Sequence, residues 1–175
     1  ELLRAGMRAV DLGAAPGGIS FAYATSADGS RMVGRSTVGP ASHGYLWTSD
    51  GMMLHGWRIM GITGHGKLSN SKCVMLFFTG KGGNRSWHDG KFQRLAALGA
   101  DVVCFDYRGY GDSAGSPDEE GLGRDAHAAW DFLKNEGVKP ESVLLYGESL
   151  GTGVATRLAA ELSERVAERR TSSGV

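Results

Sequence analysis

The stretch Gly147-Glu148-Ser149-Leu150-Gly151 decides the fold that this chain is expected to adopt. It has the form G-x-S-x-G, in which the flanking glycines allow a sharp backbone turn at the serine. The apolar residues 142–146 precede it and predict a strand, and small residues at helical spacing follow it. A strand, a tight turn and a helix in this order present the serine hydroxyl as a nucleophile, with the helix N-terminus facing a developing oxyanion.

The chain before this stretch alternates between strand and helix patterns. Strands are predicted at residues 73–78, 101–106 and 143–146, and a hairpin is predicted about Asp50-Gly51, with arms at residues 46–48 and 52–60. Because strands alternate with helices over the rest of this region, we expect a parallel sheet with crossover helices, which is an α/β fold.

Three helices are predicted. The first covers residues 86–98, with Leu98 on its apolar side and Gly99 at its end. The second begins at a capping box, Ser116-Pro117-Asp118-Glu119, with proline at its first position, and Gly137 ends it. The third covers about residues 151–166, and the polar residues 167–175 are expected to fray.

Two further loops follow predicted strands, at residues 78–84 and 106–113. In an open α/β sheet the functional loops gather at the carboxyl ends of the strands, so these loops and the serine turn are expected to converge. The second loop carries the charged residues Asp106, Arg108 and Asp112, which could be taken for catalytic groups. Glu148 is not expected to act directly, because adjacent side chains diverge at a tight turn.

These motifs, taken in order, closely resemble the α/β-hydrolase superfamily over about residues 45–165, particularly its small serine hydrolases with H-G-N-x-G-N before the first helix. The resemblance implies that Ser149 is a nucleophile that attacks a small acyl ester or thioester, without a cofactor. The oxyanion would be held by the backbone N–H groups of Leu150 and Lys81. The loop at residues 78–84 departs from the family, because the usual His is Thr79 and the usual Asn is Lys81. The resemblance also implies that Asp106, Arg108 and Asp112 are structural residues, which fix the conformation of the loop at residues 106–113 through hydrogen bonds.

The resemblance also implies an incomplete α/β-hydrolase three-layer sandwich. Residues 51–175 would be the N-terminal part of that domain, cut short after the helix that follows Ser149, and residues 1–50 a β-rich extension. The sheet of the family continues with further strands, so the strand at residues 143–146 is expected to be an exposed edge that favours self-association.

The expected catalytic triad is incomplete. In the family the triad runs Ser, then acid, then His along the chain. Only 26 residues follow Ser149, and they contain no His and no Asp. The expectation is therefore a serine hydrolase that is inactive or weakly active. Five histidines lie upstream, and the one we would test as a base is His65, on a glycine-rich loop; the set is His43, His55, His65, His88 and His127.

The first fifty residues have a different character. Residues 7–53 resemble the HAF-type extracellular repeat, with the landmarks Asp11-Leu12-Gly13, Gly17-Gly18, Ser26-Ala27-Asp28-Gly29-Ser30, Val33-Gly34 and Leu46-Trp47-Thr48. This resemblance implies short strands and allows a non-enzymatic surface or interaction module as an alternative function. It overlaps the hydrolase resemblance at residues 47–52, which favours a chimeric origin for the sequence.

A second alternative comes from residues 10–18. They resemble the cofactor loop of methyltransferases that use S-adenosylmethionine. A helix should then follow, and a second strand should end in an acidic residue that holds the ribose. Instead, residues 19–26 alternate with the period of a strand, and residues 32–36 end without a carboxylate.

Composition excludes several classes of partner. The 19 basic and 19 acidic residues balance, which gives no electrostatic case for nucleic acid, and there is no spacing typical of metal ligands. No apolar run is long enough for a transmembrane helix. Cys73 and Cys104 lie in strand-like apolar runs and are interpreted as buried thiols. A cytoplasmic location is favoured for the hydrolase part, and an extracellular one if the repeat is genuine.

Overall fold

The computed structural model describes residues 19–22, 34–38, 41–62, 73–82 and 84–172. Several predictions fall outside these ranges: the methyltransferase-like loop at residues 10–18, the repeat landmarks up to Val33, and His65. The resemblance to the HAF-type repeat therefore stays a prediction.

The described strands form one mixed sheet of seven strands in the order β1-β2-β3-β4-β6-β5-β7. Strands β1 to β4 are an antiparallel meander that joins β6, whereas β5 pairs in parallel with both β6 and β7. The parallel sheet is thus confirmed for the second half of the described chain. The strands are β1 (Ile19–Ala22), β2 (Gly34–Val38), β3 (Ala41–Trp47), β4 (Met53–Ile59), β5 (Val74–Phe78), β6 (Asp101–Phe105) and β7 (Val143–Gly147).

The predicted hairpin is formed by β3 and β4. Trp47 pairs with Met53, and the turn between them is closed by the N–H of Gly51, which donates to the carbonyl of Thr48 at 2.9 Å. Gly51 has a φ of 81°, a conformation that favours glycine. The division of the chain into residues 1–50 and 51–175 stays a prediction, although β1, β2 and β3 belong to the same sheet as the later strands.

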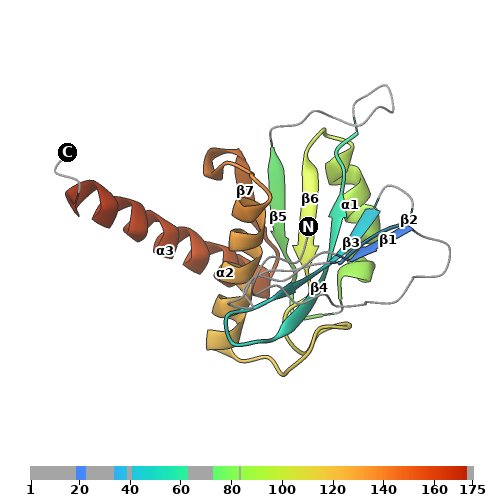
Figure 1. The fold of residues 1–175 in the computed structure, drawn as a ribbon, viewed down its shortest axis with the longest axis horizontal. Helices are drawn as coiled ribbons and strands as arrows, with labels where there is room; N and C mark the ends of the chain where they lie inside the picture. Colours follow the sequence, from blue (N-terminus) through green and yellow to red (C-terminus); the bar gives the residue numbers. More distant parts are fainter. Residues whose placement is uncertain (1–18, 23–33, 39–40, 63–72, 83, 173–175) are drawn as a thin grey trace.

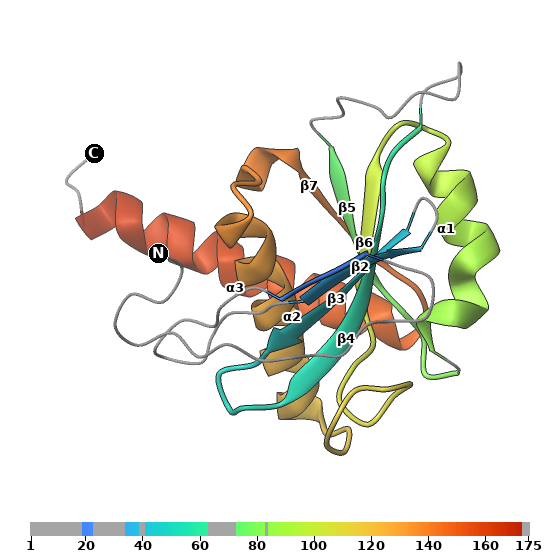
Figure 2. The same cartoon turned by 45° about the vertical axis from the view of Figure 1, so that its right-hand side comes forward.

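In the described part of the chain three α-helices pack on the sheet: α1 (Asp89–Ala96), α2 (Glu119–Asn135) and α3 (Leu150–Ser172). Short 3-10 turns lie before α1, as η1 (Arg85–His88), and before β7, as η2 (Pro140–Ser142). Figures 1 and 2 show α1 on one face of the sheet and α2 and α3 on the other, with the C-terminal half of α3 extending away from the body. This is the three-layer α/β arrangement that the sequence predicts.

Two predictions about helix ends are wrong. The cap of α2 is Asp118, whose extended backbone lets its carboxylate accept from the N–H of Gly121 at 2.7 Å. Ser116 and Pro117 therefore precede the helix, and the proline is not its first residue. The other error is the end of α3, which runs to Ser172 because its last turns are rich in Ala, Glu and Arg, which favour the helical backbone.

Each face of the sheet has its own apolar cluster. Leu54, Leu76 and Phe105 pack under α2 and α3, and Ile59, Phe77 and Val102 pack under α1. Consecutive strand residues alternate between the two clusters, so both faces are buried, as expected of a sheet between two helical layers.

Two apolar residues lie outside the core, contrary to expectation. Leu98 is 80% exposed, because α1 ends at Ala96 and Leu98 lies in the turn that follows it. Cys104 is buried as predicted, but Cys73 is exposed because it precedes β5.

Strand β7 lies at the edge of the described sheet, and its Leu144 is 49% exposed. No helix in the described ranges combines the length and the apolar character needed to span a membrane.

Candidate active site at the turn between β7 and α3

The backbone of Ser149 is strained. Its φ is 53°, and it is the one non-glycine residue with a positive φ in the described part of the chain. A left-handed conformation costs an L-residue roughly 1–2 kcal/mol, so the surroundings must hold it in place. The N–H of Thr152 donates to the Ser149 carbonyl at 2.9 Å, and the N–H of Glu148 donates to the Phe78 carbonyl at 3.0 Å. The turn thus exposes the Ser149 side chain between the end of β7 and the start of α3.

The flanking glycines are required by close backbone contacts. A Cβ at Gly147 would lie 2.3 Å from the carbonyl oxygen of Gly151, and a Cβ at Gly151 would lie 2.1 Å from the carbonyl oxygen of Phe78. Because both obstacles are backbone atoms, a side-chain rotation would not relieve them. The G-x-S-x-G pattern is therefore explained by the way α3 begins directly against the end of β5.

The glycine-rich loop after β5 lies against Ser149. A Cβ at Gly80 would be 3.2 Å from the Ser149 Cβ. Lys81 follows Gly80 in this loop, and Leu150 is the first residue of α3. Neither the Lys81 N–H nor the Leu150 N–H has a hydrogen-bond acceptor among the described residues. Two backbone donors without an acceptor thus lie at residues adjacent to the contact between Gly80 and Ser149.

The loop after β5 is tied to the loop after β6. The Tyr107 hydroxyl donates to the Thr79 carbonyl at 3.2 Å, and the Arg85 N–H donates to the Asp106 carboxylate at 2.7 Å. The Arg85 guanidinium also pairs with Asp106 and, at 2.9 Å, with Asp112. The three loops predicted to converge therefore do so. Arg85 was missed by the sequence analysis, since the only signal for it was a charged residue directly after the glycine-rich loop.

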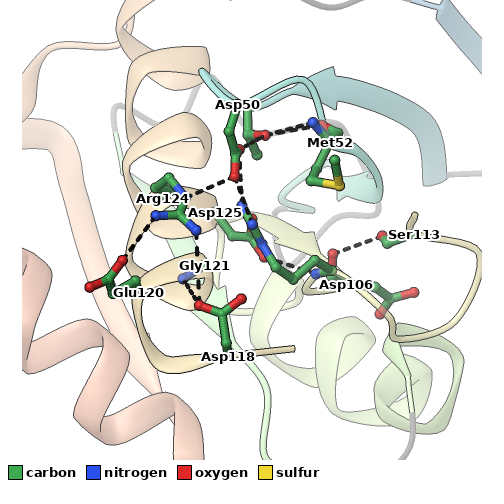
Figure 3. A network of polar contacts seen from close by, with 11 residues as sticks. Asp50, Met52, Asp106, Ser113, Asp118, Glu120, Gly121, Arg124 and Asp125 are labelled. Carbon is green, nitrogen blue, oxygen red and sulfur yellow. Dashed lines mark hydrogen bonds and ion pairs between the residues drawn. The ribbon is translucent and has the colours of Figure 1, made fainter. Parts of the chain in front are cut away.

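The structural interpretation of Asp106, Arg108 and Asp112 is confirmed. Arg108 donates to Asp125 at 2.8 and 3.0 Å and to Asp50 at 2.8 and 3.1 Å, which joins the β6 loop to α2 and to the hairpin turn. Figure 3 shows Asp50 and Asp125 in this network, and Asp50 also pairs with Arg124. Hydrogen bonds from Arg108 hold the pKa of Asp50 below its ordinary value, whereas burial raises the pKa of Asp125.

No described histidine is hydrogen-bonded to Ser149. His127 pairs with Glu161 between α2 and α3, and His88 lies among the rings of Phe77 and Phe92. His43 and His55 lie on β3 and β4, and His65 is outside the described residues.

Glu148 does not supply a base to its neighbour. Its carboxylate forms an ion pair with Lys91 of α1, and the hydrogen bond from Lys91 lowers the pKa of Glu148. The Glu148 side chain is therefore held by α1 and not by α3.

Comparison with known families shows which family the second half of the chain belongs to. The family model described as alpha/beta hydrolase fold matches residues 74–168, which include β5, β6, β7, α1, α2 and α3 as far as residue 168. The chain is 45% identical over 99 residues to the lysophosphatidylserine lipase ABHD12 of Gallus gallus, an alignment that covers 55% of this chain and 26% of the chicken protein. It thus spans about a quarter of the length of the ABHD12 relatives that it matches.

Solved structures have the same fold. An alpha-beta hydrolase from Vibrio vulnificus superposes with a TM-score of 0.62 at 26% identity, over 73% of this chain and 42% of that one. The Pyrococcus furiosus esterase Pf2001 superposes with a TM-score of 0.55 at 24% identity, over 73% of this chain and 50% of the esterase.

Proposed function

Because the chain belongs to the alpha/beta hydrolase fold family, we propose that it carries the nucleophile of a serine hydrolase, in which Ser149 attacks the carbonyl carbon of a carboxylic ester. The observation that carries this proposal is the strained, exposed Ser149 beside two backbone N–H groups that have no acceptor among the described residues. The N–H of Leu150 would lack an intrahelical acceptor at the start of any helix, but a plain strand-to-helix turn needs neither the strain nor a second free donor at Lys81.

The chemistry divides into two steps. In the first, Ser149 Oγ bonds to the carbonyl carbon, its proton passes to a base, and the carbonyl oxygen becomes an oxyanion. The N–H groups of Leu150 and Lys81 donate to that oxyanion, and the alkoxide then leaves and takes up the proton. In the second step water attacks the acyl-serine, which releases the carboxylic acid and restores the hydroxyl. A thioester follows the same course with a thiolate as the leaving group.

The base is the limiting component in this span of chain. A serine hydroxyl is a weak nucleophile at neutral pH without a base that accepts its proton. None of the described histidines is hydrogen-bonded to Ser149, and the contacts that they form are with other residues. We therefore expect residues 1–175 on their own to support slow acylation and weak turnover.

The names of the relatives support a choice of first substrates. The chicken and other vertebrate ABHD12 proteins are named lysophosphatidylserine lipases, and several solved relatives are named esterases. A long-chain lysophospholipid ester and a short-chain nitrophenyl ester are therefore the first substrates to compare.

A fluorophosphonate probe tests the nucleophile directly, because it phosphonylates an activated serine without requiring turnover. We expect slow labelling of the folded protein that is lost in Ser149→Ala. Ser163→Ala is the matched control, since Ser163 is an exposed serine on the same helix, with its hydroxyl bonded to the Ala159 carbonyl. The proposal fails if the folded protein is not labelled, or if Ser149→Ala is labelled as fast as Ser163→Ala.

A further inference from the structure

An ion pair ties the serine turn to the helix α1. The carboxylate of Glu148, the residue before Ser149, pairs with the ammonium group of Lys91 in the first turn of α1. The Lys91 ammonium group also lies 6.0 Å from the centre of the Phe77 ring on β5, within the range of a cation–π interaction. Lys91 therefore lies between the serine turn and the strand β5, which leads into the glycine-rich loop.

The ion pair joins the two halves of the candidate active site. One half is the serine turn, which carries Ser149 and the N–H of Leu150 at the start of α3. The other half is the loop after β5, which carries the N–H of Lys81 and continues through η1 into α1. Lys91 thus belongs to the segment that carries one oxyanion donor, and its partner belongs to the turn that carries the nucleophile. The separation of the two depends on how these halves are held together.

The other contacts between the halves are on the β5 side of the serine turn. The Glu148 N–H donates to the Phe78 carbonyl at 3.0 Å, and Gly80 lies against Ser149. A left-handed residue such as Ser149 persists only where its surroundings hold it, so a tether at the preceding side chain matters. Without Lys91 the Glu148 carboxylate would be an unpaired negative charge beside the residue at which an oxyanion forms, and it would oppose that charge.

We propose that Lys91 is a positioning residue, which through Glu148 holds the serine turn against the loop that carries Lys81. The proposal rests on the proposed hydrolase function, since its chemical consequence is the rate at which Ser149 attacks. Loss of the pair lets the nucleophile and the Lys81 donor move relative to each other. A displacement of about 1 Å between reacting groups can lower a rate by about 100-fold, so partial loosening has a measurable effect.

Fluorophosphonate labelling of Lys91→Met measures this effect at Ser149. We expect the rate constant at saturating probe to fall about fivefold to tenfold, with little change in the probe concentration that gives half the maximal rate. Lys91→Arg keeps a cation that can pair with a carboxylate, and should restore most of the rate. In a Glu148→Gln background, Lys91→Met should change the rate by less than about twofold, because the ion pair is already lost.

Lys134→Met is the matched control. It removes an exposed ion pair with Asp131 on α2, which lies on the other face of the sheet from α1. This variant should be labelled as fast as the wild type. Glu148 and Lys91 are 37% and 34% exposed, and exposed ion pairs contribute little to stability. Lys91→Met should therefore change the equilibrium constant for unfolding by no more than about fivefold, so slower labelling would not reflect unfolded protein.

Amide hydrogen exchange tests the position of the serine turn without labelling. The Glu148 N–H, which is bonded to the Phe78 carbonyl, should exchange about fivefold faster in Lys91→Met, because the turn opens more often. The Val138 N–H, bonded to the Leu133 carbonyl at 3.0 Å, should exchange equally in both proteins. The proposal is overturned if exchange at Glu148 is unchanged, or if Lys91→Met is labelled as fast as a labelled wild type. A wild type that is not labelled contradicts the proposed function, and exchange at Glu148 then decides the role of Lys91.

Discussion

Replacing Gly151 by alanine tests whether close contact between α3 and β5 holds the serine turn in place. The new Cβ would lie 2.1 Å from the Phe78 carbonyl oxygen and 2.5 Å from its carbon, more than 1 Å inside an ordinary contact distance. Because these are backbone atoms, the start of α3 has to move away from β5. The same carbonyl accepts from the Glu148 N–H at 3.0 Å, so that hydrogen bond is disturbed as well.

Gly153 provides a matched control in the same helix, because a Cβ there meets nothing within 4 Å. Alanine is favoured over glycine in a helix by up to about 1 kcal/mol, so Gly153→Ala should stabilise the protein by that amount. Overpacking against a fixed neighbour costs about 1–3 kcal/mol, occasionally more, so Gly151→Ala should lose about 2 kcal/mol or more despite its better helix propensity. The two variants should therefore differ by about 3 kcal/mol.

Urea unfolding followed by circular dichroism measures this difference, with equal slopes showing that both variants unfold in the same way. Fluorophosphonate labelling should also fall in Gly151→Ala, since the turn is displaced, and remain in Gly153→Ala. If Gly151→Ala is as stable as Gly153→Ala, then the packing of α3 against the end of β5 is not as described, and the explanation of the G-x-S-x-G pattern is wrong.

Three more predictions concern strain, ion pairing and pH. Ser149→Gly should raise the free energy of unfolding by about 1 kcal/mol through relief of the positive φ, while Ser149→Ala should not; urea titration compares them. Arg85→Met should lower the free energy of unfolding by about 3–5 kcal/mol, because the buried Asp106 carboxylate loses its partner. In an Asp106→Asn background the same substitution should cost much less, and a double-mutant cycle measures the difference. Because the pKa values of His43 and His55 are lowered by folding, the unfolded chain binds more protons near pH 6.5. Stability should therefore fall from about pH 7 to about pH 5, and an unchanged slope in His43→Gln/His55→Gln would contradict this.

Local patterns predicted the frame of the molecule. The hairpin about Asp50-Gly51, the strands β5 to β7 and the helices between them follow from periodicity and from glycines at turns, which act over a few residues. The wrong prediction of where α2 begins was also a local one, because two neighbouring residues could each cap the helix. Asp118 and not Ser116 caps α2, and both are residue types that favour a cap, so only the backbone conformation decides between them.

The candidate site was predictable in part. Gly147, Ser149 and Gly151 carry a signal within five residues, because the turn itself requires those residue types. The role of Arg85 carried no such signal, since its partners Asp106 and Asp112 are more than twenty residues away along the chain.

The sequence by itself therefore determined the serine turn, the order of strands and helices, and the membership of the hydrolase family. Only the tertiary structure decided which side chains meet across those elements. His43 and His55 each have an unremarkable position in the sequence, but the register of β3 against β4 places them beside Trp57 and Tyr45, facing Arg85. Pairing of this kind depends on register and loop packing, which no local pattern encodes, because a shift of one residue would turn these side chains to the other face of the sheet.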